Sequence, residues 1–196
     1  MPPPTPTDLP VSDRPPYSPS VPGILAAVDG SDGSLWALDR AMTEAELFDL
    51  PLYVLSVVNP SPGGYTLGMA EIVQESVDRL LDSMRDGLRR SVAAVQRART
   101  RPYTGPISLH VVLGNVIETV LTGSAHHHTL VVGSRGNGGF ARLLLGSVST
   151  AAAHHSGCPV LIVPAPPADH PAHNRPDPTP GSIPDPTPDA PAPDQP

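Results

Sequence analysis

The stretch VVGSRGNGGFARLLLGSVST, residues 131–150, decides the fold, because it joins a buried strand to a helix through a glycine-rich loop. Gly133 ends the strand, Gly136 lies in the loop, and Gly146 stands at or just before the helix. Glycine permits positive φ and a close approach of the backbone to another group. Backbone N–H groups in such a loop, with those that open the next helix, favour anions. A loop that only turns the chain is the alternative, and the spacing by itself does not choose between them.

Strand-like and helix-like patterns alternate on both sides of this stretch. Continuous apolar runs, typical of strands buried on both faces, occupy 23–29, 52–58, 107–113, 129–133 and 159–163. Helical spacing of apolar residues begins at Ser34, continues along 73–95, resumes near Val116 and runs from Leu143 to His155. Parallel strands need crossover helices. The order therefore predicts an α/β fold with an open parallel five-stranded sheet and helices on both faces.

The two ends of the chain differ from its middle in composition. The sequence has 196 residues and 28 prolines, most of which lie before residue 23 or after residue 165, and only 4% of it is aromatic. Such segments bury too little apolar surface to offset the entropy of an ordered chain. The sequence thus predicts a disordered Pro-rich head over 1–22, a domain over 23–164 and a disordered Pro/Asp-rich tail over 165–196.

Charge and cysteine content narrow the class of protein. The formal net charge is −7, and the middle of the chain carries no basic stripe, which argues against a nucleic-acid partner. Cys158 is the single cysteine, so no intramolecular disulfide forms and a reducing compartment is expected. The N-terminal residues do not read as a signal peptide, and no apolar run has the length of a membrane span. We expect a cytoplasmic protein without a membrane partner.

Two of the predicted strands end in residues suited to a binding site. The first run leads to Asp29 and the fourth ends at Gly133. In open α/β sheets ligands bind beyond the carboxyl ends of the strands, where the strand order reverses. The loop is not a P-loop, since no Gly-Lys-Ser/Thr follows, and Gly30 and Gly33 do not match the dinucleotide-binding spacing.

Three motifs together resemble the universal stress protein family. They are AVDGS at 27–31, the pattern Gly133-x-x-Gly136-x9-Gly146-Ser147, and CPVLIVP at 158–164. The resemblance covers residues 23–164 in element order. It implies the strand order 3-2-1-4-5, a homodimer formed through the strand at 159–164, and ATP binding, because the ATP-binding branch of the family has this glycine pattern.

The resemblance also assigns roles to individual positions. Asp29 matches the acid at the adenine and ribose end of the nucleotide, Val57 the backbone position that binds adenine, and Gly114 the glycine beside the nucleotide. The phosphate-binding set is Gly133, Gly136, Gly146 and Ser147, with Ser149 as a secondary candidate. A Mg2+ or Mn2+ ion would be held mainly through the phosphates, because no cluster of acidic ligands is evident. The chain departs from the family at Val116, where the family often has proline. It also departs at HHHT, 126–129, where the family usually has acidic sequence before the fourth strand.

Two function classes remain after these comparisons of motif and spacing. The first is a nucleotide-dependent regulatory or stress-response protein, and the alternative is an ATP hydrolase or adenylyl-transfer enzyme on the same fold. Hydrolysis needs a base and a positioned water near the γ-phosphate. Around the loop the sequence offers small neutral residues and the arginines Arg135 and Arg142, so no catalytic residue is assigned and an enzyme is disfavoured. A phospho-acceptor receiver domain is excluded, because Leu113-Gly114 stands where its aspartate is required. Neither the downstream partner nor the stress signal follows from the sequence.

Histidine clusters are a further candidate. His126, His127 and His128 are consecutive, and His154 and His155 form a pair. Consecutive residues in an extended segment point to opposite faces, so at most two of the three converge. No acid or cysteine joins them at zinc-like spacing. The sequence therefore assigns no metal site.

Overall fold

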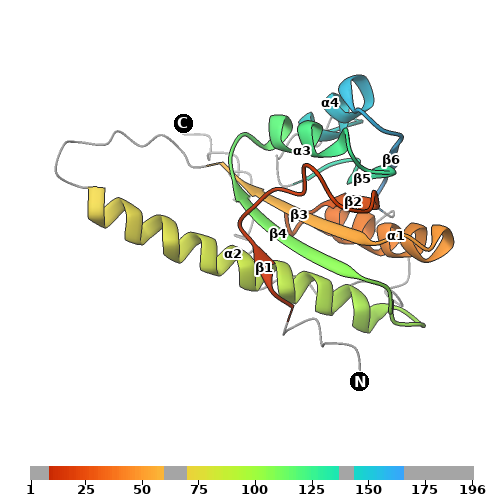
Figure 1. Cartoon of the computed structure of the whole chain (residues 1–196), viewed down its shortest axis with the longest axis horizontal. Helices are drawn as coiled ribbons and strands as arrows, with labels where there is room; N and C mark the ends of the chain where they lie inside the picture. The colour runs from red at the N-terminus through yellow and green to blue at the C-terminus, as the bar shows by residue number, and fades with distance from the viewer. Residues whose placement is uncertain (1–8, 60–69, 137–143, 166–196) are drawn as a thin grey trace, which may run out of the picture.

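The computed structural model of the chain describes residues 9–59, 70–136 and 144–165, with the backbone alone for 70–74. Arg142, part of the glycine loop and all of the tail beyond Ala165 lie outside the described residues. The described part is a parallel sheet between two layers of helices (Figure 1).

The sheet contains the five predicted strands in the predicted order. These are β2 (Ile24–Ala27), β3 (Leu52–Val58), β4 (Ile107–Leu113), β5 (Thr129–Gly133) and β6 (Val160–Val163). Their order in the sheet is β4-β3-β2-β5-β6, and all pairs are parallel. A sixth strand that the sequence did not predict, β1 (Val11–Ser12), extends the sheet beyond β4. Strand order reverses at β2, which lies between β3 and β5.

Four helices cover the two faces. They are α1 (Asp32–Phe48), α2 (Ala70–Ala98), α3 (Val116–Ser124) and α4 (Ser147–His155). Helices α1 and α2 lie on one face and α3 and α4 on the other (Figure 1). Each strand therefore contributes to two cores: Ala26 and Val131 to the α1/α2 side, Leu25 and Leu130 to the α3/α4 side.

Helix α2 is longer than the sheet that it covers. Its second half buries Leu88, Val92 and Val95, as the periodicity predicts. Leu80 lies on the apolar stripe that the sequence predicts along 73–95 but is 44% exposed, so the stripe is not buried along its whole length. The reason is geometric: the first half of α2 extends past the end of the sheet (Figure 1).

Part of the Pro-rich head is ordered, so the prediction of disorder does not hold for residues 9–22. These residues form a strap. Its first part lies along the outer side of β4, where β1 pairs with Leu109 and His110 and Leu9 enters the core, and its second part runs to the start of β2. Besides this backbone pairing, carbonyl oxygens of the strap accept hydrogen bonds from side chains of the domain, and one of these carbonyls belongs to a proline, which lacks an N–H but keeps its carbonyl. The four bonds run from Arg89 Nε to Leu9 O (3.0 Å), His110 Nδ1 to Arg14 O (2.7 Å), His127 Nε2 to Pro16 O (2.9 Å) and Tyr53 Oη to Val21 O (3.0 Å).

The last helix also begins later than predicted. Helix α4 starts at Ser147 with Gly146 as its N-cap, whereas the apolar run placed its start at Leu143. Within the described ranges, no helix is both long and apolar enough to span a bilayer.

Candidate functional site

The carboxyl ends of β2 and β5 meet at one edge of the sheet, and Asp29 follows β2 there. Its Oδ1 accepts the Ser31 backbone N–H (3.0 Å) and the Ser31 hydroxyl (2.6 Å). Gly30 has a φ of 83°, which lets the chain turn between the strand and α1. Ser31 then caps α1 by accepting the Ser34 N–H at 3.2 Å. The Asp29 carboxylate is thus fixed by the turn that opens α1.

Gly136 lies directly against this carboxylate. A Cβ at residue 136 would stand 2.3 Å from Asp29 Oδ2, closer than any side chain can approach. The two predicted site residues Asp29 and Gly136 are therefore in contact, and a side chain at 136 would displace the Asp29 carboxylate from its place in the turn.

Gly133 has a packing reason of the same kind. A Cβ there would stand 2.9 Å from the backbone C and O atoms of Gly33, and a Cβ at Gly33 would stand 2.6 Å from Arg135 O. The loop after β5 and the first turn of α1 therefore touch backbone to backbone. Sequence reasoning did not include Gly33 in the site, although its place in DGSDGS, 29–34, was the available signal.

Gly146 differs from the other two glycines. Its φ is −77° and ψ 174°, an extended conformation open to any residue. A Cβ at this position would have Arg135 Cα as its nearest neighbour, at 3.5 Å, an ordinary contact. The Gly146 N–H donates to Ser134 O at 2.7 Å, and among the described residues no side chain caps α4. The residues that the structure describes around Gly146 do not require glycine by packing. The first N–H groups of a helix have no intrahelical partner.

The two predicted serines of α4 have different surroundings. Ser147 is exposed at the first position of the helix. Ser149 is buried, and its hydroxyl is directed to Ser134 O (2.9 Å) and Gly146 O (3.1 Å). Ser149 thus ties the start of α4 to the end of β5, while Ser147 is the serine whose side chain is accessible.

Val57 and Gly114 lie at the same edge of the sheet on the other side of β2. Val57 pairs with Val112 across β3 and β4, and the Gly114 N–H donates to Val58 O at 2.9 Å. A Cβ at Gly114 would come within 2.9 Å of Thr119 Oγ1 in α3. The structure thus joins Asp29, Gly133, Gly136 and Gly146 in one contact group and places Val57 and Gly114 on neighbouring strand ends.

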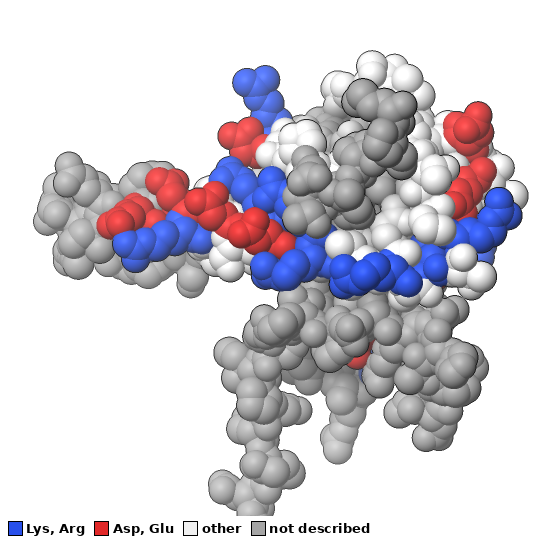
Figure 2. All heavy atoms as spheres, turned by 90° about the horizontal axis from the view of Figure 1, so that it is seen from below, with Lys and Arg blue, Asp and Glu red and all other residues white. Residues whose placement is uncertain are grey.

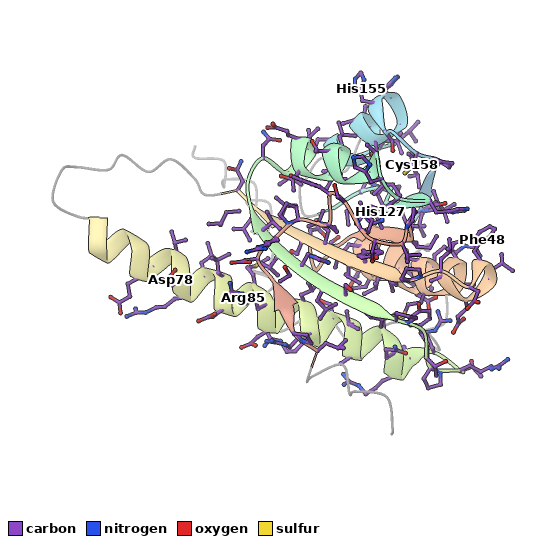
Figure 3. All side chains as sticks on the ribbon, in the orientation of Figure 1. Phe48, Asp78, Arg85, His127, His155 and Cys158 are labelled. Atoms are coloured by element: carbon purple, nitrogen blue, oxygen red, sulfur yellow. The ribbon has the colours of Figure 1, made fainter. Side chains whose placement is uncertain are left out.

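The remaining candidates lie away from this edge. His155 projects at the end of α4, whereas His127 lies within the body of the molecule (Figure 3). Cys158 is half-buried, and burial raises the pKa of its thiol. No group of three or more His, Cys, Asp or Glu residues suited to a metal ion occurs in the part of the chain that the structure describes.

Comparisons with known proteins agree with this architecture. Residues 23–164 match the model of the universal stress protein family. A universal stress protein of Mycolicibacterium smegmatis is 30% identical over 146 residues, which cover 72% of this chain and 47% of that protein. One of Mycobacterium tuberculosis is 31% identical over 158 residues, with coverage of 74% and 49%. The chain therefore spans about half the length of these curated relatives.

A solved structure shows the same fold. Universal stress protein UspA from Lactobacillus plantarum is 21% identical, covers 73% of this chain and 97% of its own, and has a TM-score of 0.61. The family match over most of the chain and the identity to the mycobacterial proteins carry the assignment. The chain belongs to the universal stress protein family.

Proposed function

We propose that this chain is an ATP-binding universal stress protein that acts as a nucleotide-dependent regulatory or stress-response protein. The nucleotide would lie at the carboxyl edge of β2 and β5, with adenosine toward Asp29, Val57 and Gly114. Its phosphates would face Gly133, Gly136, Gly146 and Ser147. Magnesium or manganese would accompany it, bound mainly by the phosphates. The choice of ATP comes from the family resemblance of the glycine pattern.

The observation that carries the proposal is the N-terminus of α4, which no side chain of the described residues caps. Gly133 and Gly136 are explained by packing against Gly33 and Asp29, but no contact among the described residues explains Gly146. Serine, threonine, aspartate and asparagine are the residues that satisfy a helix N-terminus, and a glycine there leaves the first N–H groups without a side-chain acceptor. A phosphate oxygen is an acceptor suited to those groups and to the positive end of the helix dipole.

Helix α4 also meets the rest of the candidate site. Its N-cap lies next to Gly136, whose Cα faces the Asp29 carboxylate. A nucleotide with its ribose at Asp29 would therefore have its phosphates near the start of α4. This continuity from Asp29 to Gly146 supports a single elongated ligand over two unrelated small sites.

A glycine substitution with a matched control tests the proposal. Gly146→Val places a branched side chain at the phosphate position, where the protein itself has room for a Cβ. We expect its affinity for ATP, with magnesium present, to fall at least about tenfold, which corresponds to about 1.4 kcal/mol. Gly87→Val, in a helix where the nearest atom to a Cβ is the flexible Arg90 guanidinium at 3.8 Å, is the control and should bind as the wild type does.

Isothermal titration calorimetry measures both affinities, and circular dichroism verifies that each variant is folded. Equal binding by a folded Gly146→Val variant and the wild type would show that the loop only turns the chain. No ATP uptake by the wild type at millimolar nucleotide would reject the proposal outright. A single-turnover assay at high protein concentration separates a regulatory protein, which retains its ATP, from an ATP hydrolase.

A further inference from the structure

The strap, residues 9–22, rests on two histidines of the domain. His110 of β4 has its Nδ1 2.7 Å from Arg14 O, and His127, just before β5, has its Nε2 2.9 Å from Pro16 O. A carbonyl oxygen can only accept a hydrogen bond, so these two ring nitrogens carry the protons and donate them. A neutral imidazole has one N–H. Each ring therefore uses its single N–H to hold the strap.

The other nitrogen of each ring is buried without a partner. Among the described residues, neither His110 Nε2 nor His127 Nδ1 has a hydrogen-bond partner. A second proton on either ring would place a charged donor at this buried nitrogen, which is costly without an acceptor. The rings also flank Tyr53, with centroid separations of 6.2 Å for His110 and 4.7 Å for His127. Two charged rings would therefore lie close to one another across a single aromatic side chain.

The groups around the rings do not compensate such a charge. In the strap, Asp13, Arg14 and Tyr17 are the titratable residues at or next in sequence to the two contact positions, Arg14 and Pro16. Tyr53 of β3 lies against both rings, and His126 and His128 flank His127 in the sequence. Burial lowers the pKa of both His110 and His127, and for His127 the nearby His110 and His126 lower it further. The carbonyls of Arg14, Pro16 and Gly23 act in the opposite direction without overcoming burial. Within the described ranges no carboxylate contributes to either shift.

We propose that His110 and His127 make the strap a pH-sensitive cover on the outer edge of β4, closed while both rings are neutral and released when they take up protons. Each ring's pKa in the closed state lies below its ordinary value of 6.5. The released state therefore binds protons more tightly, and acid favours it. The stability that the neutral rings give to the closed state is full above about pH 6.5 and is lost progressively as the pH falls below that value.

Release changes the surface that the sheet presents. Val11 and Ser12 leave their pairing with Leu109 and His110, so β4 becomes the outer strand. Leu9 leaves the core on the α2 side. An unpaired strand edge is a place where an extended segment of another chain can add. The device thus links acidity to the exposure of one edge of the sheet.

Backbone dynamics measured by NMR on the full chain test the proposal. At pH 7.5 the 15N order parameters of residues 11–14, 17 and 18 should be about 0.85, and at pH 5.0 they should fall below about 0.6. Those of β3 and β5 should stay high at both values, which distinguishes strap release from unfolding. Unchanged order in the strap of the wild type at pH 5.0 would overturn the proposal.

A pair of isosteric variants isolates the histidines. His110→Asn and His127→Gln together keep a neutral amide N–H at the positions of Nδ1 and Nε2 but do not titrate. The double variant should keep its strap ordered at pH 5.0, and His126→Gln, a change in the exposed neighbour, should release it as the wild type does. Release of the double variant at pH 5.0 would overturn the proposal.

The wild type alone gives a second test that does not depend on the variants folding. The ring carbon resonances of His110 and His127 should titrate with the same midpoint as the loss of strap order. Separate midpoints for the two buried rings and for the strap would contradict the coupling.

Discussion

At the scale of single residues, Asp29 combines a structural and a proposed binding role. Its Oδ1 holds the turn before α1 by accepting two hydrogen bonds from Ser31, and its Oδ2 faces Gly136. Asp29→Ala removes both the charge and the acceptor, so we expect a loss of ATP affinity of about threefold to tenfold, near 1 kcal/mol. Asp29→Asn keeps an acceptor oxygen and should lose less. Calorimetric titration of both variants measures this, and a loss for Asp29→Ala greater than that for Gly146→Val would contradict the assignment of Asp29 to the adenosine end.

Tyr103 gives a residue-scale prediction about stability and pH. It is 6% exposed, and its hydroxyl lies 3.3 Å from Leu50 O and 3.2 Å from Pro106 O. Burial, with the carboxylates of Glu46 and Asp49, raises the pKa of Tyr103 to about 12. Because this folded-state pKa lies above the unfolded value of 10, the stability gained from the neutral hydroxyl is full below pH 10 and is lost as the pH rises toward 12.

The matching variant is Tyr103→Phe. At pH 7 it should lower the free energy of unfolding by about 1 kcal/mol, since it removes the hydroxyl that lies within hydrogen-bond distance of the Leu50 and Pro106 carbonyls. Between pH 10 and 12 its urea midpoint should decline less than that of the wild type. An equally steep alkaline decline in both proteins would show that Tyr103 is not the group responsible.

How far the sequence predicts a residue's role depends on whether the role is local. Glycine at 133, 136 and 146 is visible in the sequence, and its place after a buried strand indicates a site. In the folded chain Gly133 packs on Gly33, and Gly136 packs on Asp29. The spacing of glycines in the sequence does not predict these contacts, because they join segments about a hundred residues apart. The sequence suggests Ser149 as a candidate phosphate ligand. In the structure its hydroxyl is directed to Ser134 O, which the sequence does not show.

At the scale of elements, Arg99, the residue that follows α2, links the end of this helix to α1 by hydrogen bonds. Arg99 Nη1 donates to Asp39 O (2.9 Å) and Asp39 Oδ1 (2.7 Å), and its Nη2 donates to Glu46 Oε2 (2.8 Å). Its side chain is only 11% exposed. On α2 itself, three arginines pair with acids of the same helix: Arg79 with Glu75, Arg85 with Asp82 and Arg89 with Asp86. Figure 2 shows basic and acidic side chains interspersed along the projecting part of the molecule. Arg99 therefore differs from these three arginines in linking two helices.

We expect Arg99→Ala to lower the free energy of unfolding by about 2 kcal/mol, because it leaves a half-buried carboxylate and a carbonyl without their charged donor. The control is Arg79→Ala, which breaks an exposed pair with Glu75 within α2 and should change stability by less than about 0.5 kcal/mol. Urea denaturation followed by circular dichroism measures both. Equal losses of unfolding free energy for the two variants would show that the link between α1 and α2 stabilises the protein no more than an exposed ion pair does.

The elements themselves are largely predictable, and the exceptions have a common cause. The strand order follows from alternating strands and helices together with the family resemblance, and the structure confirms it. The order of the strap is not predicted, because a high proline content indicates only that the segment has little internal structure. It does not show that the neighbouring surface supplies hydrogen-bond donors to the carbonyls of the strap. The late start of α4 is not predicted either. Apolar residues before Gly146 have the spacing of a helix, but Leu144 and Leu145 are not helical in the structure.

At the scale of the whole molecule, the two ends of the sheet are unlike. The β4 end is covered by the strap, whereas β6 pairs only with β5 in the part of the chain that the structure describes. All four residues of β6 are half-buried and apolar, with Pro159 and Pro164 on either side. An unprotected apolar edge of this kind favours pairing with another strand.

The contacts of β6 show which backbone groups face outward. Pro159 O accepts the Leu130 N–H, and Val163 O accepts the Ser134 N–H, both at the β5 side. Because backbone groups alternate along a strand, Leu161 also faces β5, while Val160 and Ile162 direct their N–H and C=O groups to the open edge. We propose that this edge pairs with the same strand of a second copy about a two-fold axis, which satisfies both edges at once.

Ile162→Pro tests this homodimer, because proline is tolerated on an edge strand but removes the outward N–H that pairing needs. We expect the wild type to have a dimeric mass by light scattering at tens of micromolar and the variant to be monomeric with an unchanged circular dichroism spectrum. Val21→Pro, an exposed position on the strap outside β1, is a control for proline in general and should remain dimeric. Its backbone carbonyl, which accepts the Tyr53 hydroxyl, is retained by proline. A monomeric mass for the wild-type protein would contradict the homodimer. A folded Ile162→Pro variant that is still a dimer would show that the interface lies elsewhere.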